Sequence, residues 1–304
     1  MIVNHCLNYF SELMGTFIVP NQSRILKPQV VEEHDTQAER MREKYKGRVL
    51  DIFNKDGNKL HAFYFSGMDH QTNQSVSSAE ETIVIFAGMG AYHYWFSAFV
   101  EKYVERGINV VIFNYRGVGK SNGKATGSGI TNDGESVVDY IEEKFQVPRH
   151  LIALHAHSLG VGPASEVAKR RSGVAIISDR SYSRLSLAFN AIVEQYVPNA
   201  FLRFLVQKLK IIRGIAWLAL KSTGWDFSPK SAWPHIRGRK CVITHLKDPI
   251  INSPARLFQS IYGRDADTHF ITAEDDCEDP HSRLLTDLEF NDAIRAIGFR
   301  NRLN

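Results

Sequence analysis

The residues best suited to chemistry lie around Ser158, where an apolar run ends and a helical pattern begins almost at once. The segment there is Ala156-His-Ser-Leu-Gly160. A serine on a tight strand-to-helix turn exposes its hydroxyl above the sheet edge, and small neighbours are needed because the backbone folds back on itself. Gly160 is one such neighbour, and Ala156 stands where the G-x-S-x-G pattern has its first glycine. We predict that Ser158 is a nucleophile; the alternative is a surface serine that caps a helix.

Nucleophilic acyl transfer also needs a histidine that takes the serine proton and a carboxylate that fixes the tautomer of that histidine. Asp248 follows a predicted strand at 240–245, and His281 lies in a loop between the last predicted strand and the last predicted helix. The order serine, acid, histidine is one in which such triads occur. We predict Ser158, Asp248 and His281 as the catalytic residues. Asp179, at the end of an earlier strand, is the alternative acid.

The chain has twelve histidines, so most of them need a plainer role. His155 and His157 lie on the strand before Ser158, and we expect them to pack or to line polar space, with His157 pointing away from the direction that Ser158 takes. His245 and His269 lie within predicted strands and are expected to be structural.

The loop at 86–95, Phe-Ala-Gly-Met-Gly-Ala-Tyr-His-Tyr-Trp, is suited to an oxyanion hole. Gly88 and Gly90 let the backbone approach a substrate carbonyl closely, and a helix that starts nearby adds the positive end of its dipole. We predict the backbone N–H groups of Met89 and Leu159 as donors, with Gly90 as the second choice after Met89. An ordinary strand-to-helix turn is the alternative.

These residues require a sheet whose strand ends converge. From Glu81 onward short apolar strands alternate with amphipathic helices, which predicts an α/β fold with a mostly parallel sheet and helices on both faces. Before them, runs at 48–54 and 59–66 joined by Lys-Asp-Gly-Asn predict an antiparallel hairpin. The later strands are expected at 82–87, 109–115, 151–156, 174–178, 240–245 and 268–272, and helices at 94–106, 133–145, after 158 and at 282–297.

The alternation lapses between Asp179 and Gly238. We therefore predict an N-terminal extension at 1–47, an α/β core at 48–180 and 238–304, and a helical cap or lid at 181–237. Within the cap, residues 201–222 are apolar apart from a narrow basic stripe. This pattern predicts either a wall of an acyl pocket with peripheral contact to anionic membrane, or a cap helix buried in the core.

Composition excludes several other classes of protein. The chain has 304 residues, 43% of them hydrophobic, and a net charge of +4 with no long basic run, so nucleic-acid binding has little support. Cys6, Cys241 and Cys277 show no disulfide or metal-ligand spacing, and we expect no metal or organic cofactor. The segment 114–121 resembles a P-loop but has Asn114 in place of the first glycine and a predicted loop after it.

No basic segment precedes the apolar N-terminus, and charged or polar residues interrupt it. We expect a cytoplasmic protein without a signal peptide or a transmembrane segment, and export by a non-classical route stays open.

Several of these segments together carry a family resemblance: Ala87-Gly-Met-Gly, Asn114-Tyr-Arg-Gly-Val-Gly-Lys-Ser-Asn-Gly, Ala156-His-Ser-Leu-Gly, Ser178-Asp-Arg-Ser-Tyr-Ser, Asp248-Pro and Pro280-His281. Over about residues 48–299 the chain resembles the serine-hydrolase branch of the α/β-hydrolase superfamily. It is most similar to the bacterial CHLPS-type hydrolase-like family. The resemblance implies an α/β-hydrolase fold and a serine hydrolase without a cofactor.

The leading functional hypothesis is a serine hydrolase that cleaves an ester or thioester, with an acyl chain or lipid favoured, through an acyl-enzyme intermediate. Dehalogenases and epoxide hydrolases of this fold use an aspartate nucleophile, so Ser158 argues against both. Ala156, and an oxyanion loop without a His-Gly pair, keep a second hypothesis open, that of a catalytically silent binding protein. A small-ester esterase and a peptidase are further alternatives.

Overall fold

The computed structural model describes residues 2–68, 80–188, 210–253 and 255–300. Its described residues form a sheet of eight strands in the order β1-β2-β4-β3-β5-β6-β7-β8. β1 and β2 form an antiparallel hairpin, β2 is antiparallel to β4, and the other neighbours are parallel. The strands are β1 (Arg48–Phe53), β2 (Lys59–Phe65), β3 (Thr82–Phe86), β4 (Asn109–Phe113), β5 (Ile152–His157), β6 (Ala175–Asp179), β7 (Lys240–His245) and β8 (Thr268–Ala273).

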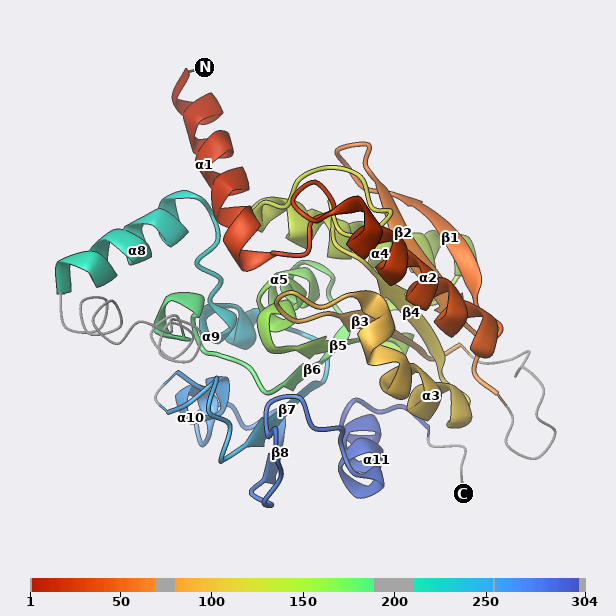
Figure 1. Ribbon diagram of the computed structural model, residues 1–304. Helices are drawn as coiled ribbons and strands as arrows, with labels where there is room; N and C mark the ends of the chain where they lie inside the picture. Colours follow the sequence, from red (N-terminus) through yellow and green to blue (C-terminus); the bar gives the residue numbers. More distant parts are fainter. Residues whose placement is uncertain (1, 69–79, 189–209, 254, 301–304) are drawn as a thin grey trace.

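Helices cover both faces of the sheet (Figure 1). Alternate residues of β3 show why, because Val84 and Phe86 pack into one core and Ile83 and Ile85 into the other. The first core also takes side chains from α4 (Gly127–Phe145) and α5 (Val161–Arg170), and the second takes them from α3 (Ser97–Glu105) and α11 (Asp287–Ala296). This architecture confirms the predicted mostly parallel α/β sheet with helices on both faces.

The N-terminal extension forms two helices, α1 (Ile2–Ile18) and α2 (Pro28–Lys44). The Ser11 hydroxyl donates to the carbonyl of Thr223 at 2.8 Å, and the Trp225 indole donates to the carbonyl of Ser11 at 2.8 Å. α2 buries Ala38 and Met41 in the core that contains α3. The extension is thus tied both to the core and to the segment between β6 and β7.

Two predicted helix starts are wrong. α4 begins at Gly127 and not at Asp133, because the Thr126 side chain accepts the N–H of Gly129 and caps the helix. The segment expected to be a loop after the P-loop-like stretch is therefore partly helical. α11 begins at Asp287 and not at Ser282, because Thr286 and Glu289 form a reciprocal capping box.

Between β6 and β7 the described residues contain α8 (Lys210–Ser222) and the short α9 (Pro229–Ala232). Residues 189–209 of the predicted cap at 181–237, and with them the first part of the 201–222 segment, lie outside the described residues. Short helices complete the fold: α10 (Leu257–Ile261) and 3₁₀ turns at His93–Phe96, Arg149–Leu151, Ser158–Gly160 and Trp233–His235. Among the helices that the structure describes, none has the length and apolar character needed to cross a membrane.

Candidate active site

Ser158 occupies a strained turn between β5 and α5. Its φ is 51°, in the left-handed region that residues with a Cβ rarely adopt. The turn is tight enough that a Cβ at Gly160 would collide with the carbonyl oxygens of Phe86 and Ala87. Ala156 is fully buried opposite Phe86 in the sheet, so its methyl group is accommodated there. The local geometry is that of a nucleophile elbow.

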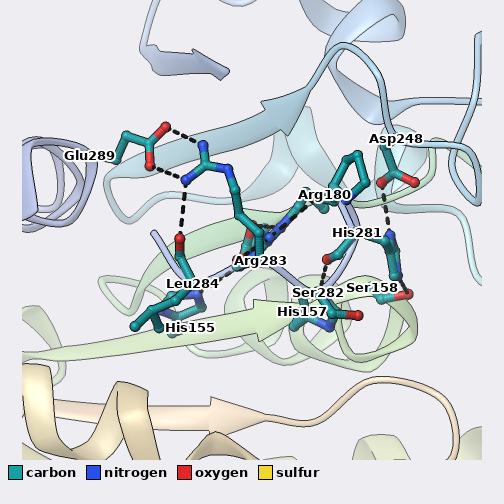
Figure 2. Close-up of polar contacts among 12 residues, drawn as sticks. His155, His157, Ser158, Arg180, Asp248, His281, Ser282, Arg283, Leu284 and Glu289 are labelled. Atoms are coloured by element: carbon teal, nitrogen blue, oxygen red, sulfur yellow. Dashed lines mark hydrogen bonds and ion pairs between the residues drawn. The ribbon is translucent and has the colours of Figure 1, made fainter. Parts of the chain in front are cut away.

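His281 lies between Ser158 and Asp248 (Figure 2). Its Nδ1 is 2.8 Å from Oδ2 of Asp248, and its Nε2 is 3.0 Å from Oγ of Ser158. An ionised carboxylate only accepts hydrogen bonds, so Nδ1 carries the proton of the neutral ring and Nε2 accepts from the serine hydroxyl. The structure thus brings together the three residues that the sequence analysis singled out.

The surroundings of Asp248 keep its carboxylate charged. Its Oδ1 accepts the backbone N–H groups of Ile250 at 2.8 Å and Ile251 at 3.0 Å. Burial raises the pKa of Asp248, but the hydrogen bond and charge of His281, with these two N–H groups, outweigh burial and hold the pKa below its ordinary value. The carboxylate can therefore stabilise an imidazolium that forms on His281.

Asp179, the alternative acid, faces other partners. Its two carboxylate oxygens accept Nε and Nη2 of Arg180, each at 2.7 Å, and Oδ2 also lies 3.4 Å from Nε2 of His155. Burial raises the pKa of Asp179, but the charge of Arg180 and the hydrogen bond from His155 outweigh it, so the pKa lies well below its ordinary value. The carboxylate in contact with His281 is that of Asp248.

The predicted oxyanion loop lies against Ser158. A Cβ built on Gly88 would come within 3.4 Å of Cβ of Ser158. Met89 and Leu159 line the same cavity as Ser158. Gly90 instead lies beside Pro20, and its carbonyl accepts the side-chain amide of Asn21. The role of Met89, Leu159 or Gly90 as an oxyanion donor stays a prediction.

The prediction that His157 packs or lines polar space agrees with its place in the lining of the cavity at Ser158, but the prediction that it points away from Ser158 is wrong. The sequence did not predict its contact with His281. Its Nε2 donates to the backbone carbonyl of His281 at 2.9 Å. Burial, with the charge of His281, lowers the pKa of His157 to about 3, so this ring is neutral at physiological pH. The signal was present in the sequence only as a histidine next to the nucleophile, a position that many buried residue types can fill.

A cavity of about 750 Å³ opens at Ser158. This volume is within the usual range for small-molecule sites. Its walls are mostly apolar and come from distant parts of the chain, including the N-terminal helix α1, whose role the sequence analysis did not predict. The apolar lining includes Met14, Phe17, Ile18, Trp95, Phe96, Phe99, Leu185, Leu220 and Ile250.

One cluster among the described residues has metal-ligand chemistry, at His245, Asp275 and Cys277. Nδ1 of His245 accepts the backbone N–H of Lys247 at 3.2 Å, so the proton of the neutral ring lies on Nε2, the atom that faces the other two groups. Arg283 adds a positive charge 3.2 Å from Asp275. A protonated nitrogen and a guanidinium both disfavour a cation, so these residues do not fit a metal site.

Part of the chain is similar in sequence to known proteins. Residues 77–197 match a family model described as "Serine aminopeptidase, S33". "Uncharacterized protein YfhR" is 27% identical over 158 residues in Salmonella typhi and 25% identical over 149 residues in Escherichia coli K12, matches that cover 48% of this chain. The chain spans about half the length of these curated relatives, 51% and 50%.

Solved structures share the fold over most of the chain. The esterase Pf2001 of Pyrococcus furiosus covers 86% of this chain, with 93% of its own length matched, at a TM-score of 0.62 and 14% identity. An alpha-beta hydrolase of Vibrio vulnificus covers 93% of this chain, with 89% of its own length matched, at 0.64 and 14% identity. These likenesses show that the chain has the α/β-hydrolase fold.

Proposed function

We propose that this protein is a serine hydrolase that cleaves an ester or thioester through an acyl-enzyme intermediate. The observation that carries the proposal is the position of His281, with one ring nitrogen on Asp248 at 2.8 Å and the other on the Ser158 hydroxyl at 3.0 Å. The Ser158 hydroxyl would attack the substrate carbonyl carbon as His281 takes its proton. The same proton would then pass to the leaving group, and water would release the acyl group in a second, equivalent cycle.

The shape and lining of the cavity support an apolar acyl group as the preferred substrate. Aromatic and aliphatic side chains surround Ser158, and Arg180, a cation that lines the cavity, has its guanidinium bonded to Asp179 and to loop carbonyls. An apolar wall gives affinity in proportion to the acyl surface that it buries. The exposed side chains of Trp217 and Leu218 on α8, with the exposed Lys221, support a peripheral contact with lipid near this cavity.

Two experiments test the proposal. The first is labelling with a fluorophosphonate, and the second is an assay of p-nitrophenyl esters and thioesters of increasing chain length. We expect stoichiometric labelling of Ser158 and a kcat/KM that rises from acetyl to octanoyl substrates. Co-sedimentation with anionic vesicles, weakened by salt, would support the lipid contact. Equal rates on acetyl and octanoyl esters would leave a small-ester esterase, and the absence of both labelling and turnover would favour a binding protein.

A further inference from the structure

The position of His281 depends on its backbone as well as on Asp248. The residue lies in the loop between β8 and α11, at 274–286, which has no regular secondary structure. An imidazole that swings with its loop loses the 3.0 Å contact with Ser158 even while it stays hydrogen-bonded to a carboxylate. The hydrogen bonds to the carbonyl oxygens of this loop help to fix its backbone.

His157 makes the first of these bonds. Its Nε2 lies 2.9 Å from the carbonyl oxygen of His281, and the two rings are 5.0 Å apart at an interplanar angle of 55° (Figure 2). A carbonyl only accepts, so His157 is the tautomer with its proton on Nε2. On its other side, a Cβ built on Gly88 would be 3.1 Å from Nδ1 of His157. The ring thus lies between the oxyanion loop and the loop of the general base, next in sequence to Ser158.

Arg180 makes two further contacts of this kind. Its Nη1 donates to the carbonyl of Arg283 and lies 3.4 Å from that of Pro280. Its Nε and Nη2 are held by Asp179, and the residue is only 3% exposed. Its φ of 47° is in the left-handed region, which costs energy for a residue with a side chain. Four of the five guanidinium N–H groups face these partners, so most of the guanidinium is directed at Asp179 and at the loop.

We propose that His157 and Arg180 are positioning residues for the general base, which hold the His281 loop by its backbone carbonyls so that Nε2 of His281 stays on Ser158. Both side chains come from the carboxyl ends of β5 and β6, the same sheet edge that presents the nucleophile. The sheet therefore fixes the serine and the backbone of its base in one frame. This inference rests on the proposed hydrolase function for its kinetic readout.

Three variants separate this role from general destabilisation. His157→Leu removes the hydrogen-bond donor Nε2 and puts an apolar side chain of intermediate size in place of the ring. His157→Gln keeps an N–H₂ donor at a similar distance from the backbone. His61→Leu is the matched control, since His61 is another buried histidine, with a pKa lowered to about 4 by burial, whose ring nitrogens have no hydrogen-bond partner in the described part of the chain.

We expect kcat of His157→Leu to fall on the order of 10²-fold, because a small displacement of a catalytic group has that effect. KM should change little, and fluorophosphonate labelling of Ser158 should slow in parallel with kcat because both need the base. His157→Gln should restore most of the loss, and His61→Leu should leave kcat unchanged. Amide hydrogen exchange across 279–284 should be faster in His157→Leu than in His157→Gln or the wild type.

Arg180→Lys is the second test, because a lysine keeps the charge beside Asp179 but has no fork to reach the loop as well. We expect lower kcat with faster loop exchange in a folded protein. Wild-type rates in both His157→Leu and Arg180→Lys would overturn the proposal, as would equal losses in His157→Leu and His157→Gln with unchanged loop exchange. If the wild-type protein is neither labelled nor active, the hydrolase proposal fails, and loop exchange alone decides on the two positioning residues.

Discussion

The described part of the chain includes two hydrogen-bonded rows, each made of an acid, a histidine and a hydroxyl. One consists of Asp248, His281 and Ser158, with contacts of 2.8 and 3.0 Å. The other consists of Asp179, His155 and Tyr103, with contacts of 3.4 and 2.7 Å. The same three kinds of group stand in the same order, so composition alone does not distinguish a catalytic row from a structural one.

The partners of the acid are the first difference. Asp248 receives two backbone N–H groups on one oxygen, which leaves the other oxygen for His281. Asp179 accepts hydrogen bonds from Nε and Nη2 of Arg180. Its contact with His155, at 3.4 Å, is longer than the 2.8 Å contact between Asp248 and His281. A carboxylate whose charge is already balanced by a guanidinium does less to stabilise an imidazolium beside it.

The surroundings of the hydroxyl are the second difference. Ser158 lines the cavity, whereas Tyr103, a residue of α3, is only 1% exposed. Burial raises the pKa of Tyr103 well above its ordinary value, so its phenol stays protonated. We infer from this comparison that such a row can take part in catalysis only under two conditions. Its hydroxyl must be accessible to a substrate, and its acid must be free to stabilise the charged histidine.

Removal of the hydroxyl from the first row should have the largest effect of all. Ser158→Ala should lower kcat on the order of 10⁵-fold or more, because triad members act as a unit. Steady-state hydrolysis of the best p-nitrophenyl ester measures the effect, with a thermal melt as control for folding. Equally efficient fluorophosphonate labelling of another serine, such as Ser121 or Ser128, in this variant would contradict the assignment.

The two acids should differ sharply in activity. Asp248→Asn should lower kcat by about 10⁴-fold, because an amide favours the wrong tautomer of His281. Asp179→Asn should lower kcat by no more than about tenfold, through the loop that Arg180 holds. Both values come from the same ester assay, and the reverse ranking would move the catalytic acid to Asp179.

The sequence predicted the sheet and the meeting of Ser158, Asp248 and His281 because each of these features has a local signature. Apolar alternation marks strands, a serine between strand and helix marks the turn, and an acid and a histidine follow later strands in a fixed order. Parallel strands bring their carboxyl ends to one edge, so residues at those ends meet without any knowledge of the tertiary structure.

The contacts of Arg180 and His157 could not be predicted in this way. The bonds from Arg180 to the His281 loop depend on a left-handed φ of 47° and on a loop a hundred residues away. Met14 and Ile18 on α1 have helical spacing that predicts an inner face, but nothing in the sequence says that this face lines the cavity. Side-chain contacts of this kind follow from packing, which local patterns do not encode.

The ranking of the two acids should reverse for stability: Asp179→Asn, which loses less activity than Asp248→Asn, should lose more stability. Asp179→Asn leaves the buried Arg180 without its charged partner and should cost about 3 kcal/mol of unfolding free energy. The folded pKa of Asp179 is below its ordinary value of 3.8, so its contribution is fully present above that pH and is lost as the pH falls further. Urea unfolding should show a constant gap from wild type between pH 5 and 8 that narrows below pH 4. A gap that widens on acidification would contradict this account.

Removal of the hydroxyl from the second row should have the smallest effect. Tyr103→Phe deletes the hydroxyl that lies 2.7 Å from Nδ1 of His155. It keeps the ring, whose centroid lies 4.5 Å from that of Phe290 in the wild-type protein. The loss of one buried hydrogen bond should cost about 1 kcal/mol of unfolding free energy. Hydrolysis should proceed at the wild-type rate, because neither His155 nor Tyr103 is among the residues that line the cavity. Urea unfolding and the ester assay on Ser158→Ala and Tyr103→Phe side by side test the comparison directly, since each variant removes one oxygen from the end of one row. A large fall in kcat for Tyr103→Phe without loss of stability would show that the second row takes part in catalysis.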